Sequence, residues 1–264
     1  MIKEIVKNRR MLFELAKSDF KKRFAGSYFG IAWMFIQPVA TVLVFFLIFQ
    51  LGMKSQPPVP GTPYVIWLIP GLVPWFFFSE TLSLSTTVFQ EYSYLVKKVV
   101  FPVEFLPVIK VMSCFFVHAC FVVIMLIVFL ISGRMPQASW VGIVYYSVAC
   151  AVLSLGISLI TASVFVFFRD MQNIVAIILQ FGMWLAPIMY WEGIFTVSHP
   201  WLLYVFKANP FYYIVAGYRD SMLTGNFFWE RPLLTLYYWV VVIVIGYLGL
   251  RIFRKLRPHF SDVL

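Results

Sequence analysis

Six intervals of this chain carry no acidic or basic residue over a length that could cross a lipid bilayer. They lie between Arg23 and Lys54, Lys54 and Glu80, Lys110 and Arg134, Arg134 and Arg169, Asp170 and Glu192, and Arg231 and Arg251. A helix needs roughly 20 apolar residues to cross the hydrocarbon core, and backbone groups in lipid must hydrogen-bond within their own segment. The pattern predicts six transmembrane helices, over 30–52, 64–86, 107–131, 141–168, 172–191 and 233–252.

The composition agrees with a protein that lies mostly in lipid. The chain is 62% hydrophobic and 12% charged, whereas soluble domains carry about 25% charged residues. We therefore expect an all-α polytopic membrane protein with a single transmembrane domain over residues 1–264. The three cysteines, Cys114, Cys120 and Cys150, all fall inside predicted spans and are interpreted as small buried hydrophobic residues.

The distribution of positive charge predicts the orientation. With six spans, 16 of the 21 lysines and arginines fall on the side that carries both termini, and 5 fall on the other side. Positive residues are retained on the cytoplasmic side, so both termini are predicted to be cytoplasmic. A net charge of +10 could also indicate nucleic-acid binding. The charges flank spans and form no separate basic domain, so we expect no nucleic-acid partner.

Two cytoplasmic segments have the pattern of helices on the membrane surface. Within residues 1–25, apolar residues recur every three to four positions with lysine and arginine between them, which predicts an amphipathic interface helix. It could anchor the chain to lipid, touch a cytoplasmic partner, or do both. The segment 91–106 mixes charged and apolar residues between two spans. We interpret it as a docking helix, with an ordinary interfacial loop as the alternative.

The segment "NPFYYIVAGYRDSMLTGN", Asn209 to Asn226, is too apolar for an external loop, yet Arg219 and Asp220 interrupt it too centrally for a span. Asn209 and Pro210 can begin a helix, and Gly225 can end one. Together with its flanks it predicts a region, 193–232, that enters the outer leaflet and returns. The alternative is a connector that lies on the membrane surface.

Residues that could carry chemistry are few. The sequence has no G-x-x-x-x-G-K-[ST] loop for a nucleotide phosphate, and His118, His199 and His259 are far apart. Glu80 and His118 lie within predicted spans, where we expect Glu80 to reach toward the interface and His118 to be neutral and hydrogen-bonded. Aromatic rings could line a pore that sugars slide along; the candidates are Trp33, Phe46, Trp184 and Tyr190. The alternative for each ring is a place in an interface belt or in helix packing.

The order of these features resembles the membrane subunit of ABC type-2 exporters, specifically permeases for O-antigen, capsular polysaccharide or teichoic acid. The resemblance covers essentially the whole chain. It rests on the amphipathic N-terminus, on the pattern Pro210, Phe211, Tyr213, Arg219, and on the segments "RFAGSYFGIAWMFIQPV", "LVKKVVFPVEFLP", "FRDMQNI" and "LRPHFSDVL".

This resemblance implies a homodimer around a central channel in the bacterial cytoplasmic (inner) membrane, with two ABC ATPase subunits bound below it. ATP and Mg would be bound by those partners, so no cofactor and no metal are expected in this chain, and no catalytic residue. The cargo would be a lipid-linked glycan. The coupling interface would comprise Tyr94, Lys97, Lys98, Phe101, Glu104, Arg9 and Arg10. Paired re-entrant helices would form an outer gate with Pro210, Tyr213, Tyr218 and Arg219.

Two other functions remain as alternatives at this stage. A drug or antibiotic efflux permease of the same ABC type-2 class would share the layout. A membrane enzyme acting on lipid-linked sugars would need an acid, a base or a nucleophile converging at one membrane depth. No such set can be placed in the sequence, which favours transport.

Overall fold

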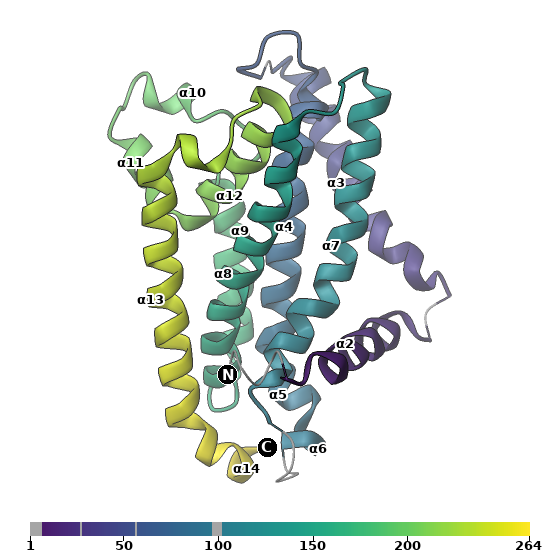
Figure 1. Cartoon of the computed structure of the whole chain (residues 1–264), viewed down its shortest axis with the longest axis vertical. Helices are drawn as coiled ribbons and strands as arrows, with labels where there is room; N and C mark the ends of the chain where they lie inside the picture. Colours follow the sequence, from purple (N-terminus) through teal and green to yellow (C-terminus); the bar gives the residue numbers. More distant parts are fainter. Residues whose placement is uncertain (1–6, 27, 56, 97–101) are drawn as a thin grey trace.

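The computed structural model describes residues 7–26, 28–55, 57–96 and 102–264, and its long helices run along one common direction (Figure 1). Within this described part the chain is helical and contains no strand. Among the described residues, five helices are long and apolar enough to cross a membrane: Gly30–Gly52, Tyr64–Thr86, Phe105–Ile131, Ala138–Phe165 and Pro232–His259.

The helices follow one another with short connections. Their bounds are α2 (Arg9–Phe24), α3 (Trp33–Phe45), α4 (Tyr64–Thr86), α5 (Val88–Glu91), α6 (Ser93–Val96), α7 (Phe105–Ile131), α8 (Gly142–Phe165), α9 (Met171–Leu185), α10 (Gly193–Thr196), α11 (Leu202–Ala208), α12 (Pro210–Arg219), α13 (Pro232–Leu256) and α14 (Phe260–Val263). A π-helical turn continues α3 over Phe46–Gly52, and another continues α12 over Asp220–Thr224.

The predicted helix over 172–191 is shorter in the structure, where α9 ends at Leu185. Pro187 explains the early end, because the residue before a proline is driven out of the helical region. Ala186 accordingly has extended backbone angles, φ −84° and ψ 124°. A helix of 15 residues is about 22 Å long, which is less than the hydrocarbon core of about 30 Å.

The helix α4 forms the centre of the bundle and packs against α7, α8, α9 and α12. In its most apolar window 72% of the residues are buried, whereas only 6% are buried in Gly30–Gly52. Both helices are strongly apolar, so they must differ in what covers them. The side chains of α4 are covered by this chain, and those of Gly30–Gly52 are left for lipid or for another protein.

A close backbone contact joins α8 to α13. A Cβ atom on Gly249 would lie 2.7 Å from the carbonyl oxygen of Gly156, too close for any side chain. Small residues allow this approach, and close backbone packing is a principal source of helix association in lipid. The two glycines therefore fix α13 on the edge of the bundle.

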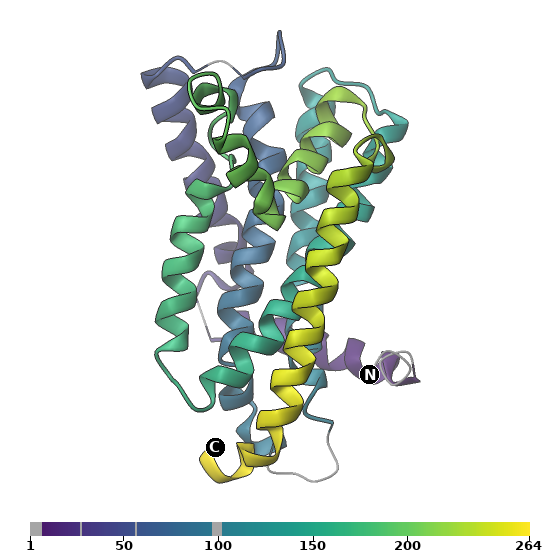
Figure 2. The same ribbon diagram turned by 90° about the vertical axis from the view of Figure 1, so that its left-hand side faces the viewer.

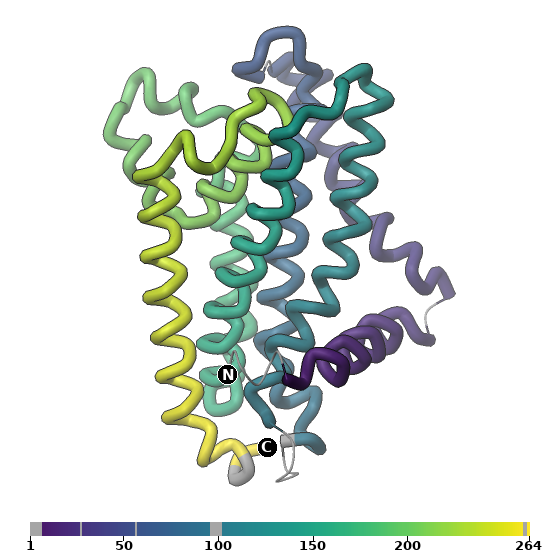
Figure 3. Tube along the Cα trace, viewed as in Figure 1, coloured from purple at the N-terminus to yellow at the C-terminus, as the bar shows by residue number. Residues whose placement is uncertain are grey.

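The shorter helices gather at the two ends of the bundle. The tube in Figure 3 shows that α2, α5, α6 and α14 lie toward the end that carries the C-terminus. At the opposite end α11 and α12 form a V whose tip points into the bundle (Figure 2). These two ends hold the candidate sites.

Candidate functional site

A buried ionic cluster lies at the end that carries the C-terminus. The Lys110 ammonium on α7 is 2.7 Å from a carboxylate oxygen of Asp19 on α2 and 2.9 Å from one of Glu91 on α5. The Tyr92 hydroxyl donates a hydrogen bond of 2.5 Å to Asp19. We call these four residues the Asp19–Lys110 cluster. It joins the N-terminal helix to both chain segments that flank 97–101.

The burial of the cluster follows from the register of α2. Leu12, Ala16 and Asp19 are the buried residues of that helix, so Asp19 occupies a position of the apolar stripe. Asp19 is only 3% exposed and Lys110 is 5% exposed. A buried charge needs a partner of opposite charge, and Asp19 and Lys110 are partners of this kind for each other. Burial, and then the hydrogen bond to Asp19, raise the pKa of Tyr92 far above its usual value, so its hydroxyl remains a donor.

A second ion pair holds the other end of the predicted docking segment. Glu104, just before α7, accepts a hydrogen bond of 3.0 Å from Arg257 at the end of α13. Of the predicted coupling residues, Tyr94 on α6 is 52% exposed, and Arg9 and Arg10 are exposed on α2. Lys97, Lys98 and Phe101 lie outside the described residues.

At the opposite end, Arg219 binds the backbone where α9 stops. Its guanidinium donates to the carbonyl oxygens of Pro187 at 2.7 Å and Ile188 at 2.5 Å, and its Nε donates to that of Trp67 at 3.4 Å. It also lies over the Trp67 ring, 3.5 Å from the ring centroid. A planar guanidinium presents several donors in a fixed geometry, which suits adjacent carbonyl oxygens.

A tyrosine completes this capping. The Tyr64 hydroxyl at the start of α4 donates to the carbonyl oxygen of Met189 at 2.6 Å. Ala186, Ile188 and Met189 are essentially fully buried. Because α9 has ended, the carbonyl groups of these residues have no helical partner, and a buried carbonyl group without a partner is costly. Arg219 and Tyr64 therefore hold a non-helical segment inside the protein; we call residues 186–189 the capped break.

The helix α12 is fixed by its tyrosines. The hydroxyl of Tyr218 lies 2.9 Å from Nε2 of His118 on α7 and 2.5 Å from Oγ of Ser147 on α8. The predicted hydrogen-bonded state of His118 is thus confirmed. Tyr213 forms hydrogen bonds of 3.0 Å with Tyr145 and 3.0 Å with Thr235. Both tyrosines of the predicted gate are buried.

The start of α12 and its close packing in the bundle have clear local causes. Pro210 is the first residue of the helix, and the Asn209 side chain accepts a hydrogen bond of 3.0 Å from the backbone N–H of Phe211. This is the N-cap arrangement expected from the sequence. Gly217 faces Tyr146, and a Cβ there would lie 2.1 Å from the ring, so the helix can pack this closely only with glycine.

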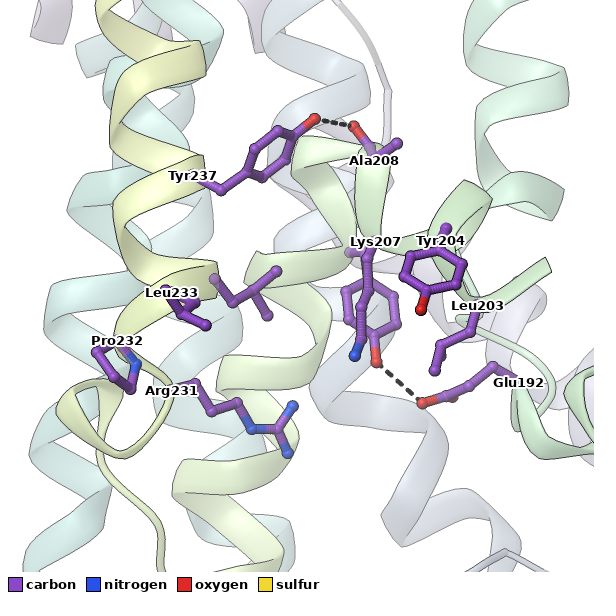
Figure 4. Close-up of a pocket in the computed structure, with 11 residues that line it drawn as sticks. Glu192, Leu203, Tyr204, Lys207, Ala208, Arg231, Pro232, Leu233 and Tyr237 are labelled. Carbon is purple, nitrogen blue, oxygen red and sulfur yellow. Dashed lines mark hydrogen bonds between the residues drawn. The ribbon is translucent and has the colours of Figure 1, made fainter. Parts of the chain in front are cut away.

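A cavity of about 810 Å³ opens between α11, α12 and α13. Figure 4 shows Glu192, Tyr204 and Lys207 on one side, with Arg231 and Leu233 on the side of α13. The hydroxyl of Tyr212 donates to Glu192 at 3.0 Å. Arg231 also pairs with Asp220 at 3.0 Å. The pKa of Asp220 is raised above its usual value, because burial raises it by more than the nearby Arg231 lowers it.

The predicted channel aromatics differ in exposure. Trp33 on α3 is 51% exposed and Trp184 on α9 is 55% exposed, so both rings are available on the surface of the chain. Phe46 is partly buried. The Tyr190 hydroxyl donates to the carbonyl oxygen of Trp184 at 2.5 Å, and its ring packs on Phe206. The structure does not bring these four together in one pocket.

Among the described residues there is no group of three or more His, Cys, Asp or Glu side chains that could hold a metal ion. The sequence reasoning missed Asp19, Glu91, Tyr92 and Tyr64. A signal for Asp19 was present, because it continues the Leu12–Ala16 spacing of the apolar stripe. The others have no local signal, since their partners lie far away in the chain.

Known proteins resemble this chain along most of its length. The model of a family described as "ABC-2 type transporter" matches residues 10–223. The O-antigen export system permease protein RfbA of Klebsiella pneumoniae is 27% identical over 96% of this chain and 95% of its own. The protein of the same name from Myxococcus xanthus is 26% identical over 99% and 98%. The polysialic acid transport protein KpsM of Escherichia coli is 22% identical over 89% of each chain.

Proposed function

The chain belongs to the ABC-2 type transporter family, and we propose that it is the membrane subunit of an ATP-driven polysaccharide exporter. The observation that carries this proposal is the match to O-antigen export permeases over nearly the full length of both chains. The second group of relatives is named for polysialic acid transport, which is also export of a polysaccharide. Both names favour a glycan cargo over the drug-efflux alternative.

The proposed cargo is a polysaccharide such as O-antigen, capsule or teichoic acid on a lipid carrier. A lipid-linked glycan combines an apolar chain with many hydroxyl groups. Exposed rings such as Trp33 and Trp184 would offer sugar faces a contact without a strong geometric demand. A route of this kind tolerates a long repeating polymer, because no single tight site has to release each sugar.

The proposed partner is an ABC ATPase, two copies of which would bind a dimer of this chain. The permease would lie in the inner membrane with both termini cytoplasmic, as the lysine and arginine distribution supports. The ATPase would then meet the end that carries α2, α5 and α6. Exposed Tyr94, Arg9 and Arg10 at this end support the assignment of a docking surface there. No nucleic-acid partner is proposed.

The proposed topology has six spans, with α9 and the capped break together forming the fifth. The 15-residue α9 is too short alone, but non-helical backbone is tolerated in a membrane where it is buried in protein. The carbonyl oxygens of the break are hydrogen-bonded to Arg219 and Tyr64, which meets that condition. We assign α11 and α12 as a re-entrant pair on the outer side, which would form a gate containing Pro210, Tyr213, Tyr218 and Arg219.

The test is to reconstitute this chain with its proposed partner ABC ATPase in proteoliposomes. We expect a complex with two copies of each chain, and lipid-linked glycan from the native host should stimulate its ATP hydrolysis and be transported. The control is an ATPase variant in which the lysine of the phosphate-binding loop is replaced, because this change removes hydrolysis and leaves this chain unaltered. The proposal fails if no stable complex forms, or if the glycan neither stimulates hydrolysis nor moves.

A further inference from the structure

A second cavity lies where the N-terminal helix meets the first long helix. It has a volume of about 430 Å³, within the usual range for small-ligand sites. Its walls come from α2, α3, α4 and α7, so it lies at the junction of the interface helix with the bundle. Its polar lining residues are Arg23, Gln37, Ser79, Glu80 and Ser83, and its rings are Phe24, Trp33, Phe76 and Phe121.

The cavity contains a donor without an acceptor. One end of the Arg23 guanidinium pairs with Glu80, but Nη1 is buried and has no hydrogen-bond partner among the described residues. Buried donors of this kind are rare in proteins and are costly to leave unpaired. In addition, Pro38 has no N–H to donate to the carbonyl oxygen of Met34, and both residues line the cavity. The site therefore offers an unpaired donor on Arg23, with the Glu80 carboxylate beside it as an acceptor.

The charges favour a neutral polar ligand. The Glu80 carboxylate is paired with Arg23, so it cancels the positive charge and would repel a phosphate. A sugar ring suits this pair better, because adjacent hydroxyl groups both donate to a carboxylate and accept from a guanidinium. The Trp33 ring borders the cavity and is 51% exposed, so its face can receive the apolar C–H groups of a sugar.

We propose that this cavity, with Arg23, Glu80, Gln37 and Trp33, binds a sugar ring of the lipid-linked glycan at the cytoplasmic membrane surface. The inference rests on the proposed function and deepens it by placing a recognition site before the channel. Its position fits that role, since the amphipathic α2 lies at the interface and α3 is the first span. A sugar held there would lie next to its lipid carrier in the inner leaflet.

The experiment measures the glycan concentration that half-maximally stimulates ATP hydrolysis by the reconstituted complex. The two probes are lipid-linked glycan extracted from the native host and polyprenyl diphosphate without sugar. For the glycan, Trp33→Ala should raise the half-maximal concentration roughly tenfold, and Gln37→Ala roughly fivefold. Trp33→Phe should restore most of the response because it keeps a ring. Ile36→Ala is the matched control, because Ile36 is 41% exposed on the same helix and does not line the cavity.

Three other results would overturn the assignment in distinguishable ways. If the glycan does not stimulate ATP hydrolysis by the unaltered complex, both the proposed function and the proposed site are wrong. If the unaltered complex responds to the glycan and both alanine variants have the same half-maximal glycan concentration as it does, the sugar site is wrong and the proposed function stands. An equal weakening toward glycan and sugar-free diphosphate would show that the cavity recognises the carrier phosphate. Hydrolysis without glycan should be the same in the Ile36→Ala control and in the unaltered complex.

Discussion

Arg219 illustrates how one side chain can replace a missing turn of helix. Its position was noticeable in the sequence because it interrupts an apolar stretch, and the resemblance assigned it to a gate. In the structure the guanidinium is occupied by backbone carbonyl oxygens of the capped break and by the Trp67 ring. Its direct contacts are thus structural, and any effect on a gate would act through the position of residues 186–189.

We predict that Arg219→Gln loosens the capped break. The shorter neutral amide cannot reach two carbonyl oxygens at once, and unpaired buried carbonyls together with the lost charge should cost roughly 3 kcal/mol of stability. Hydrogen–deuterium exchange should rise in residues 186–192 and stay unchanged in α8. Arg231→Gln is the control, because Arg231 pairs with Asp220 and does not contact the break. Unchanged exchange in residues 186–192 would contradict the capping role.

At the scale of elements, α12 is held by tight packing as much as by hydrogen bonds. Gly217 lets it approach α8 so closely that the Tyr146 ring occupies the space of a side chain. Protein interiors are packed densely, and added atoms force displacements. The position of α12, and with it that of Arg219, therefore depends on the absence of a single methyl group.

We predict that Gly217→Ala destabilises the protein by about 1–3 kcal/mol, because a methyl group would overlap the Tyr146 ring. The matched control is Gly246→Ala on α13, where nothing lies within 4 Å of the added Cβ. That change should be neutral or slightly stabilising, because alanine favours a helix. Thermal unfolding in detergent separates the two. A Gly217→Ala midpoint equal to that of Gly246→Ala would contradict tight packing of α12.

Some element bounds were predictable from the sequence. The structure has helices over Gly30–Gly52 and Tyr64–Thr86, the same bounds as the predicted ranges, and the proline-rich connection that ends at Pro63 separates the two. The fifth range was too long, because a run of apolar residues conceals the effect of Pro187. Tyr64 and Glu91 could not be assigned, since their roles depend on partners 125 and 19 positions away.

At the scale of the molecule, the proposed docking segment is fixed from two sides. The Asp19–Lys110 cluster ties its flanks to the N-terminal helix, and the Glu104–Arg257 pair ties it to the end of α13. A force applied to that segment by an ATPase would therefore reach α2, α7 and α13 together. This connection is a mechanical prerequisite for converting hydrolysis into movement of the spans.

We predict that Lys110→Met destabilises the protein by roughly 3–5 kcal/mol, because it leaves the Asp19 carboxylate buried without a cation. The double variant Asp19→Asn with Lys110→Met should recover most of this loss, since no charge remains buried and the amide oxygen still accepts from Tyr92. Thermal unfolding measures the recovery.

The double variant also tests the mechanical connection. In the reconstituted complex it should hydrolyse ATP but transport less glycan per ATP, because the ionic contact between α2 and Lys110 is lost and only the Tyr92 hydrogen bond still joins α2 to the segment. Transport per ATP equal to that of the unaltered complex would show that the cluster serves stability only.

The long sequence separation within these ion pairs also sets an order of events during synthesis. Lys110 is made 91 residues after Asp19, and Arg257 is made 153 residues after Glu104. The N-terminal helix must therefore wait at the membrane surface until the third long helix has inserted. The Glu104–Arg257 pair can form only after α13 has been made. An ATPase that recognises the form with both ion pairs would bind permeases whose last long helix has been made and pass over shorter nascent ones, so assembly itself would act as a check on membrane insertion.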